Sequence, residues 1–86
     1  MISLNDACKN AIEFADYKDK KTINWVAETE KRFLVAIKSK DEEYYSPIGV
    51  MKENGKTTVF FPTDDYDDYK TMRKLDIPAQ YRGYNT

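Results

Sequence analysis

The N-terminal segment carries apolar residues at helical spacing. One stripe recurs every three or four positions, the repeat of an amphipathic helix, and consists of Leu4, Ala7, Cys8, Ala11 and Ala15. Ser3 stands where an N-cap residue can accept a hydrogen bond from a free amide of the first turn. Ile2 and Ala7 hold the positions of a hydrophobic staple. The pattern predicts a helix over residues 4–16.

Two segments rich in β-branched and aromatic residues follow, residues 22–29 and 32–39. Together they are too long for one strand and predict a hairpin. Strict alternation would place two apolar sets on one face: Ile23, Trp25 and Ala27 from the first strand, and Phe33, Val35 and Ile37 from the second. The sets share a face only if Thr29 lies opposite Phe33, which requires a three-residue connection at 30–32 or a bulge nearby. Leu34 and Ala36 on the other face indicate a central strand covered on both sides.

A second hairpin is predicted around Asn54-Gly55, because a type I′ turn favours these residues at its two positive φ angles. A two-residue turn would pair Val50 with Val59 and Ile48 with Phe61. Pro47 suits a strand start or an edge, since it lacks an amide hydrogen.

Pro62 ends the predicted sheet, and Thr63 is the expected N-cap of a second helix. Acidic residues open this helix and basic residues close it, the order that the helix dipole favours. Three residues spaced by three would seat it on the sheet: Tyr66, Tyr69 and Met72. Residues 76–86 are expected to be extended, and either mobile or pinned by Ile77, Tyr81 and Tyr84.

These elements predict one α+β domain spanning residues 1–86. Its expected core is an antiparallel sheet of about four strands, built from two consecutive hairpins, packed by the N-terminal helix and followed by a short C-terminal helix, in the order α-β-β-β-β-α. A chain of 86 residues has material for a single core.

Charge and cysteine content limit the partners and the cellular compartment that the sequence favours. Fourteen basic and fifteen acidic residues leave a net charge of -1, so direct nucleic-acid binding through a broad positive field is not expected. Cys8 is the only cysteine, which suits a reducing compartment. No leader or membrane-spanning run is recognisable, and the chain is expected to be cytoplasmic with no membrane partner.

The sequence offers no recognisable catalytic, cofactor or metal site. It contains no histidine, the commonest general base and zinc ligand. Cys8 lies on the buried stripe of the first helix and is assigned to packing. An acidic run begins at Asp64, but counting an EF-hand loop from there puts Tyr69 and Leu75 where glycine and glutamate are required. The chain is therefore not expected to be an enzyme.

Tyrosines beside acidic residues are the most unusual feature. Tyrosine is enriched at interface hot spots, so the candidate interaction residues are Tyr44, Tyr45, Asp64, Asp65, Tyr66, Asp67, Asp68 and Tyr69. Two other interpretations stand beside this one. The tyrosines can complete a small core, or alternating Tyr and Asp can imitate a nucleic-acid backbone.

The order of helix and two hairpins over residues 4–61 resembles PepSY-like domains and small bacterial toxin-immunity proteins. The similarity rests on Ala7, Ala11 and Ala15 and on the turn segment 50–56; the Asp-x-x-Thr-Gly turn typical of PepSY-like domains is absent. The resemblance implies a binding or inhibitory module and carries over no site residues.

We therefore expect a non-enzymatic protein-binding module, such as an immunity or inhibitor protein of bacterial or phage origin, whose partner presents a basic surface. One alternative is a small-ligand or nucleotide-binding domain in which Trp25 or a tyrosine pair stacks on a ring. Another is an acidic nucleic-acid mimic with an anti-defence role.

Overall fold

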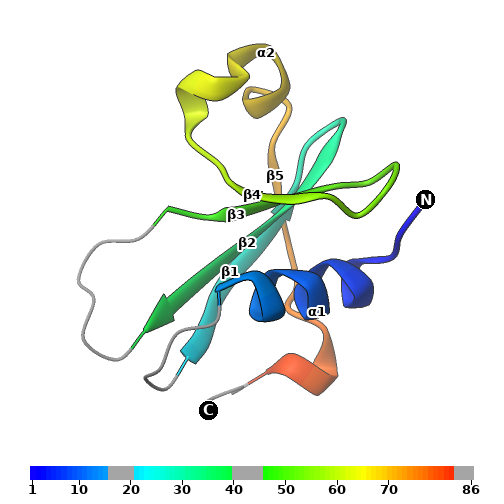
Figure 1. Ribbon diagram of the computed structural model, residues 1–86, viewed down its shortest axis with the longest axis vertical. Coiled ribbons are helices and arrows are strands. Elements are labelled where there is room, and N and C mark those ends of the chain that lie inside the picture. Colours follow the sequence, from blue (N-terminus) through cyan, green and yellow to red (C-terminus); the bar gives the residue numbers. More distant parts are fainter. Residues whose placement is uncertain (16–20, 40–45, 83–86) are drawn as a thin grey trace.

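A computed structural model describes residues 1–15, 21–39 and 46–82 of the chain. Five antiparallel strands form one sheet in the order β4-β3-β2-β1-β5, which confirms the predicted α+β class. Figure 1 shows helix α1 on one side of the sheet and the short helix α2 on the other. The elements are α1 (Leu4–Ala15), β1 (Lys21–Glu28), β2 (Arg32–Ser39), β3 (Ile48–Met51), β4 (Thr57–Val59), η1 (Pro62–Asp64), α2 (Tyr66–Tyr69), β5 (Arg73–Leu75) and η2 (Ala79–Tyr81).

Helix α1 forms as its sequence predicts. The Asp6 amide donates to the Ser3 hydroxyl at 3.1 Å, and the Ser3 amide donates back to the Asp6 carboxylate at 3.3 Å. This reciprocal cap satisfies amides that the first turn leaves without helical partners. Ala7, Cys8 and Ala11 are buried against the sheet. Burial raises the pKa of the Cys8 thiol to about 11, so the thiol stays protonated at neutral pH and serves packing.

The predicted register of the first hairpin is wrong. Glu28, not Thr29, lies opposite Phe33, and a hydrogen bond from the Thr29 amide to the Arg32 carbonyl closes a two-residue turn. The irregularity lies inside β1 instead. Ile23 pairs with Ile37 whereas Trp25 pairs with Ala36, so Asn24 is an extra residue, a β-bulge.

The bulge redistributes the apolar residues of β1 over both faces of the sheet. Ile23 and Val26 share the α1 face with Phe33, Val35 and Ile37. On the opposite face, Ala27 and Leu34 join Phe60 in a second cluster that also contacts Trp25, Tyr69 and Met72. Strand β2 is thus central and covered on both sides, as Leu34 and Ala36 predicted.

The second hairpin also pairs differently from the prediction. Val50 lies opposite Thr57 and Ile48 opposite Val59, a shift of two residues that keeps the alternation of faces. The loop has four residues, 52–55, because the Gly55 amide donates to the Met51 carbonyl at 2.8 Å with Gly55 at a φ of 76°. Asn54 uses its side chain to accept from the Lys56 amide, a local bond that replaces the expected type I′ turn.

The predicted second helix is largely replaced by other elements. A 3₁₀ turn, η1, comes first, and α2 has only four residues with Asp65, not Thr63, as its N-cap. A fifth strand, β5, was not predicted; it pairs antiparallel with β1, placing Leu75 opposite Val26. Arg73 donates through Nε to Glu28 at 2.6 Å, so a residue expected at the end of a helix lies on a sheet edge instead.

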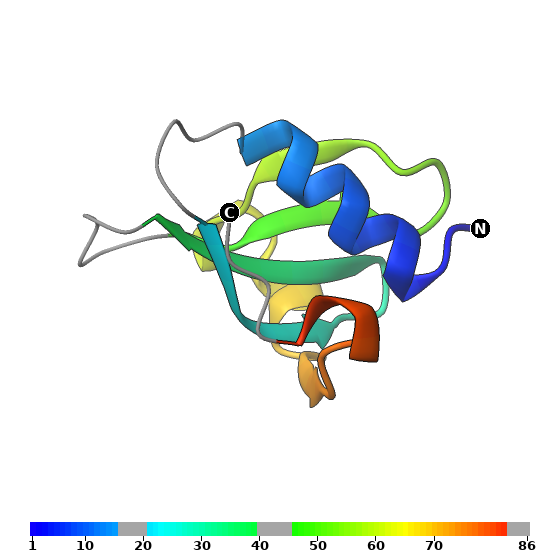
Figure 2. The same ribbon diagram turned by 90° about the horizontal axis from the view of Figure 1, so that it is seen from below.

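The described part of the C-terminal segment is not extended throughout as predicted, because it contains the 3₁₀ turn η2. Ile77 and Tyr81 pack against the core on the α1 face, and Tyr84 lies outside the described residues. Figure 2 shows β4 and β5 at opposite margins of the sheet. No helix in the described part of the chain is long and apolar enough to cross a membrane.

Deleting Asn24 tests the bulge. Without the extra residue, alternation turns the buried Ile23 away from α1, and we expect the free energy of unfolding to fall by about 2–5 kcal/mol in urea denaturation. The matched variant Asn24→Ala keeps the bulge and should lose less than about 1 kcal/mol. Equal losses in the two variants would contradict this role.

Candidate functional site

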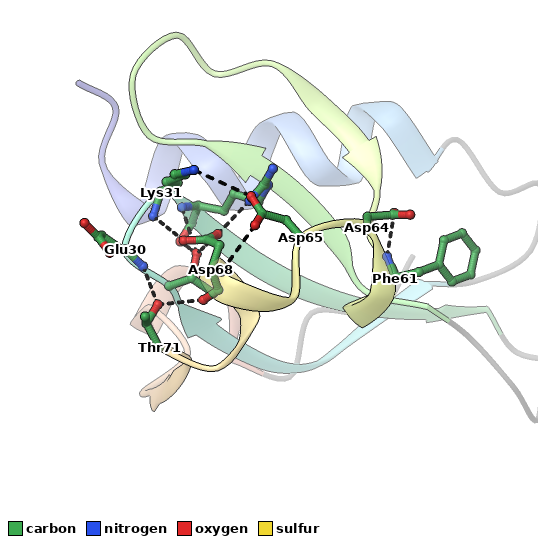
Figure 3. A network of polar contacts seen from close by, with 9 residues as sticks. Glu30, Lys31, Phe61, Asp64, Asp65, Asp68 and Thr71 are labelled. Atoms are coloured by element: carbon green, nitrogen blue, oxygen red, sulfur yellow. Dashed lines mark hydrogen bonds and ion pairs between the residues drawn. The ribbon is translucent and has the colours of Figure 1, made fainter.

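A buried carboxylate joins the segment after β4 to the β1–β2 turn. The side chain of Asp68 is 0% exposed. It accepts three hydrogen bonds: from the Thr29 hydroxyl at 2.6 Å, from Nη1 of Arg32 at 2.6 Å and from the Lys31 amide at 2.9 Å. Figure 3 shows this carboxylate among residues of both segments. A charge removed from water is tolerated when it is paired and hydrogen-bonded, and both conditions are met here.

Asp65 completes the network from the edge of the same cluster. Its carboxylate accepts from Nη1 of Arg32 at 3.1 Å and from the Asp68 amide at 3.3 Å, which makes it the N-cap of α2. The hydrogen bond from Arg32 is the main reason that the pKa of Asp65 is lowered. Burial is the largest single influence on the pKa of Arg32 and lowers it, but the hydrogen bonds to Asp68 and Asp65 and the charges of these carboxylates together outweigh burial and raise the pKa of the guanidinium.

Two further contacts fasten the same segments. The Glu30 amide donates to the Thr71 hydroxyl at 2.8 Å, and that hydroxyl donates to the Asp68 carbonyl at 2.6 Å. The Arg32 guanidinium lies 5.1 Å from the centre of the Phe60 ring, in cation–π geometry. In the described ranges, every buried side-chain nitrogen and oxygen has a hydrogen-bond partner. The backbone from Asp65 to Thr71 is therefore held in place by contacts with the β1–β2 turn, in addition to the hydrogen bonds within α2.

The remaining acidic residues of this segment point outward. The side chain of Asp67 is 91% exposed, and Tyr66 between the two pairs of aspartates is 65% exposed. Asp64 is also exposed and accepts from the Phe61 amide at 3.0 Å, on the side away from Asp68 in Figure 3. We call Asp64, Tyr66 and Asp67 the acidic ledge. Asp67 pairs with Lys70 at 3.6 Å, a solvent-exposed contact of little energetic weight.

The structure therefore divides the candidate interaction residues predicted from sequence. Asp64, Tyr66 and Asp67 are at the surface, whereas Asp68 is buried and Asp65 is half-buried. Tyr69 is half-buried with its ring centre 6.2 Å from that of Phe60. Tyr44 and Tyr45 lie outside the described residues. Asp68 is therefore not available to a partner, because Arg32 and Thr29 enclose its carboxylate.

Sequence reasoning missed Arg32 as the centre of the network. The one local signal is the Asp-x-x-Asp spacing of Asp65 and Asp68, which matches an N-cap followed by a residue of the first helical turn. Nothing local connects this pair to Arg32, more than thirty positions earlier in the chain.

A second surface feature lies by the bulge, where a pocket of about 450 Å³ is lined by Asn24, Trp25, Leu75, Asp76, Ile77 and Arg82. Lys74 places its ammonium 4.1 Å from the centre of the Trp25 ring, and Nε of Arg82 donates to the Ile77 carbonyl at 3.0 Å. An aromatic ring and a guanidinium thus lie in one hollow.

Residues 1–15, 21–39 and 46–82 contain no cluster of three acidic or thiol side chains placed to hold a metal ion. Comparisons with protein families, curated proteins and solved structures found no match.

Neighbouring aspartates give a matched test of the network. Asp68→Asn removes the buried charge that faces Arg32, and we expect it to lower the free energy of unfolding by about 3 kcal/mol. Asp67→Asn alters an exposed carboxylate one position away and should change stability by less than about 0.5 kcal/mol. Urea denaturation measures both variants, and similar losses would show that Asp68 is not the anchor.

Proposed function

We propose that this protein is a non-enzymatic protein-binding module that uses the acidic ledge to bind a basic surface of its partner. The observation that carries the proposal is an exposed tyrosine between two exposed carboxylates, on backbone that a buried ionic network holds in place. Tyrosine offers a large contact area at low entropic cost and is frequent among binding hot spots.

Pre-organisation supports this proposal. An isolated helix of four residues is unstable in water, so α2 would be disordered without its tertiary contacts. Asp68 and Thr71 fasten the segment to the β1–β2 turn, and the ledge is ordered before any partner arrives. Binding through an ordered surface avoids the entropy cost of fixing a flexible loop.

The charges of the ledge favour a protein partner over nucleic-acid mimicry. Arg32 neutralises Asp65 and Asp68 inside the fold, which leaves Asp64 and Asp67 as the outward charges of the run. Imitation of a phosphate backbone needs a longer, regular series of negative charges. Two carboxylates beside a tyrosine suit a compact basic patch, the kind of surface that an inhibitor or immunity protein blocks. The buried, unpaired Cys8 fits a cytoplasmic location.

Affinity capture with paired variants tests the function. We expect the double variant Tyr66→Ala/Asp67→Lys to lose a partner that the wild-type chain retains, with at least a tenfold rise in Kd by calorimetry. The control Glu13→Lys reverses an exposed charge on α1 and should bind like wild type. Asp65 and Asp68 stay unchanged, because replacing them disturbs the fold. A partner that binds the double variant and wild type equally would contradict the proposal.

Small-ligand or nucleotide binding is a second candidate, favoured by the pocket beside Trp25. Its volume of about 450 Å³ falls in the range of small-molecule sites, and Trp25 and Arg82 offer a ring for stacking and a guanidinium for phosphate. A nucleotide at one hundred times its Kd would stabilise the fold by about 2.7 kcal/mol. Thermal denaturation with nucleotides should then show a rise in Tm that Arg82→Gln abolishes. The absence of a shift at millimolar nucleotide would remove this candidate.

A further inference from the structure

Within residues 1–15, 21–39 and 46–82, no strand pairs with the outer edge of β4, which leaves two of its residues open for pairing. In an antiparallel pair, alternate residues direct their amides and carbonyls to the neighbouring strand. The Met51 amide donates to the Lys56 carbonyl, and the Phe60 amide donates to the Pro47 carbonyl, both at 2.9 Å. The main-chain amides and carbonyls of the even-numbered residues in this segment therefore point toward β3. The amides and carbonyls of Thr57 and Val59 face outward, on the terminal strand of the described sheet.

The two margins of the sheet differ in how they discourage pairing. On β5, Arg73 and Lys74 are exposed and charged, a common protection of sheet edges against association. Strand β4 consists of Thr57, Thr58 and Val59, which are uncharged and β-branched, and Val59 is 42% exposed. Of these two margins, β4 is the one whose residues favour adding a strand.

Charges of opposite sign bound the open margin. Lys56 precedes β4, and at the other end the carboxylate of Asp64 accepts the next outward amide, that of Phe61. The open stretch is therefore limited to Thr57 and Val59, with a positive side chain at its beginning and a negative one at its end. When two such strands run antiparallel, the positive end of each strand lies beside the negative end of the other.

An apolar strip accompanies the margin on the α1 side. The Asn10 amide group donates to the Gly55 carbonyl at 3.5 Å, which places this flank of α1 beside the beginning of the β4 segment. Phe14 lies one turn further along the same flank, and Figure 2 shows α1 and β4 running in the same direction. Phe14 is 44% exposed, Val59 42% and Phe61 50%.

We propose that β4 pairs with β4 of a second copy of this chain, antiparallel about a two-fold axis at Thr58. Thr57 of each copy then lies opposite Val59 of the other, and the two pairs exchange four main-chain hydrogen bonds. Lys56 of each copy approaches Asp64 of the other, and the strips of Phe14, Val59 and Phe61 come together. The two sheets join into one.

We infer a second copy of this chain as the partner of β4, because the margin of β4 is complementary to itself. A two-fold interface requires one surface to match itself, and both the charge order and the hydrogen-bond pattern around Thr58 do so. Asp64 belongs to both surfaces, but the inference does not rest on the proposed partner binding, because Tyr66 and Asp67 lie outside the paired residues.

Sedimentation equilibrium of the full chain tests the pairing. We expect a concentration-dependent mass that rises from one chain to two, and Val59→Lys should raise the dimer Kd at least tenfold because it places like charges across the axis. The control Gln80→Lys adds the same charge on η2 and should leave the dimer Kd unchanged. Circular dichroism checks that both variants are folded.

Cross-linking tests the position of the axis. Thr58 would face its own counterpart as a non-hydrogen-bonded pair with a Cα separation of about 4.5 Å, a separation that a disulfide can span. Under mild oxidation, Thr58→Cys should form covalent dimers at least tenfold faster than the exposed control Gln80→Cys. A wild-type chain that remains a single chain at about 1 mM would overturn the proposal. Unchanged dimerisation of Val59→Lys, or equal cross-linking of the two cysteine variants, would overturn it as well.

Discussion

The ion pair between Arg32 and the buried carboxylate of Asp68 determines how the chain after β4 is arranged. Arg32 lies at the start of β2, and Asp68 lies in a helix of four residues that is too short to persist alone. Their contact at 2.6 Å, with Thr29 and Lys31 as further donors, attaches that helix to the face of the sheet that α1 leaves open. Once the segment is attached, the chain is directed back along β1, where β5 forms.

The bulge at Asn24 makes this arrangement compatible with a well-packed core. It lets Ile23 and Val26 face α1 while Trp25 and Ala27 face the opposite cluster. Both faces of the central strand are then buried, one under a helix and the other under Phe60, Tyr69 and Met72. A strictly alternating β1 would place Ile23 on the same face as Trp25 and Ala27, and Ile23 would then no longer pack under α1.

Buried and exposed residues alternate within the acidic segment, so the same few positions both hold the backbone and present side chains to solvent. Asp65 and Asp68 hold the backbone, whereas Asp64, Tyr66 and Asp67 reach solvent from the same few positions. Asp64 also caps the Phe61 amide and so closes one end of the β4 margin. The proposed partner binding and self-association would thus use adjacent surfaces that share Asp64.

The sequence by itself determined α1, its Ser3 cap, the α+β class and the approximate strand positions, because each follows from a local periodicity or a local hydrogen bond. The tertiary structure decided the register of both hairpins, since a bulge at an ordinary Asn and a four-residue loop closed by Gly55 leave no distinctive local pattern. It also decided that Arg73 begins a strand. The ledge shows the same division: the acidic run is visible in the sequence, but only its contacts with Arg32 determine which carboxylates are buried and which remain exposed.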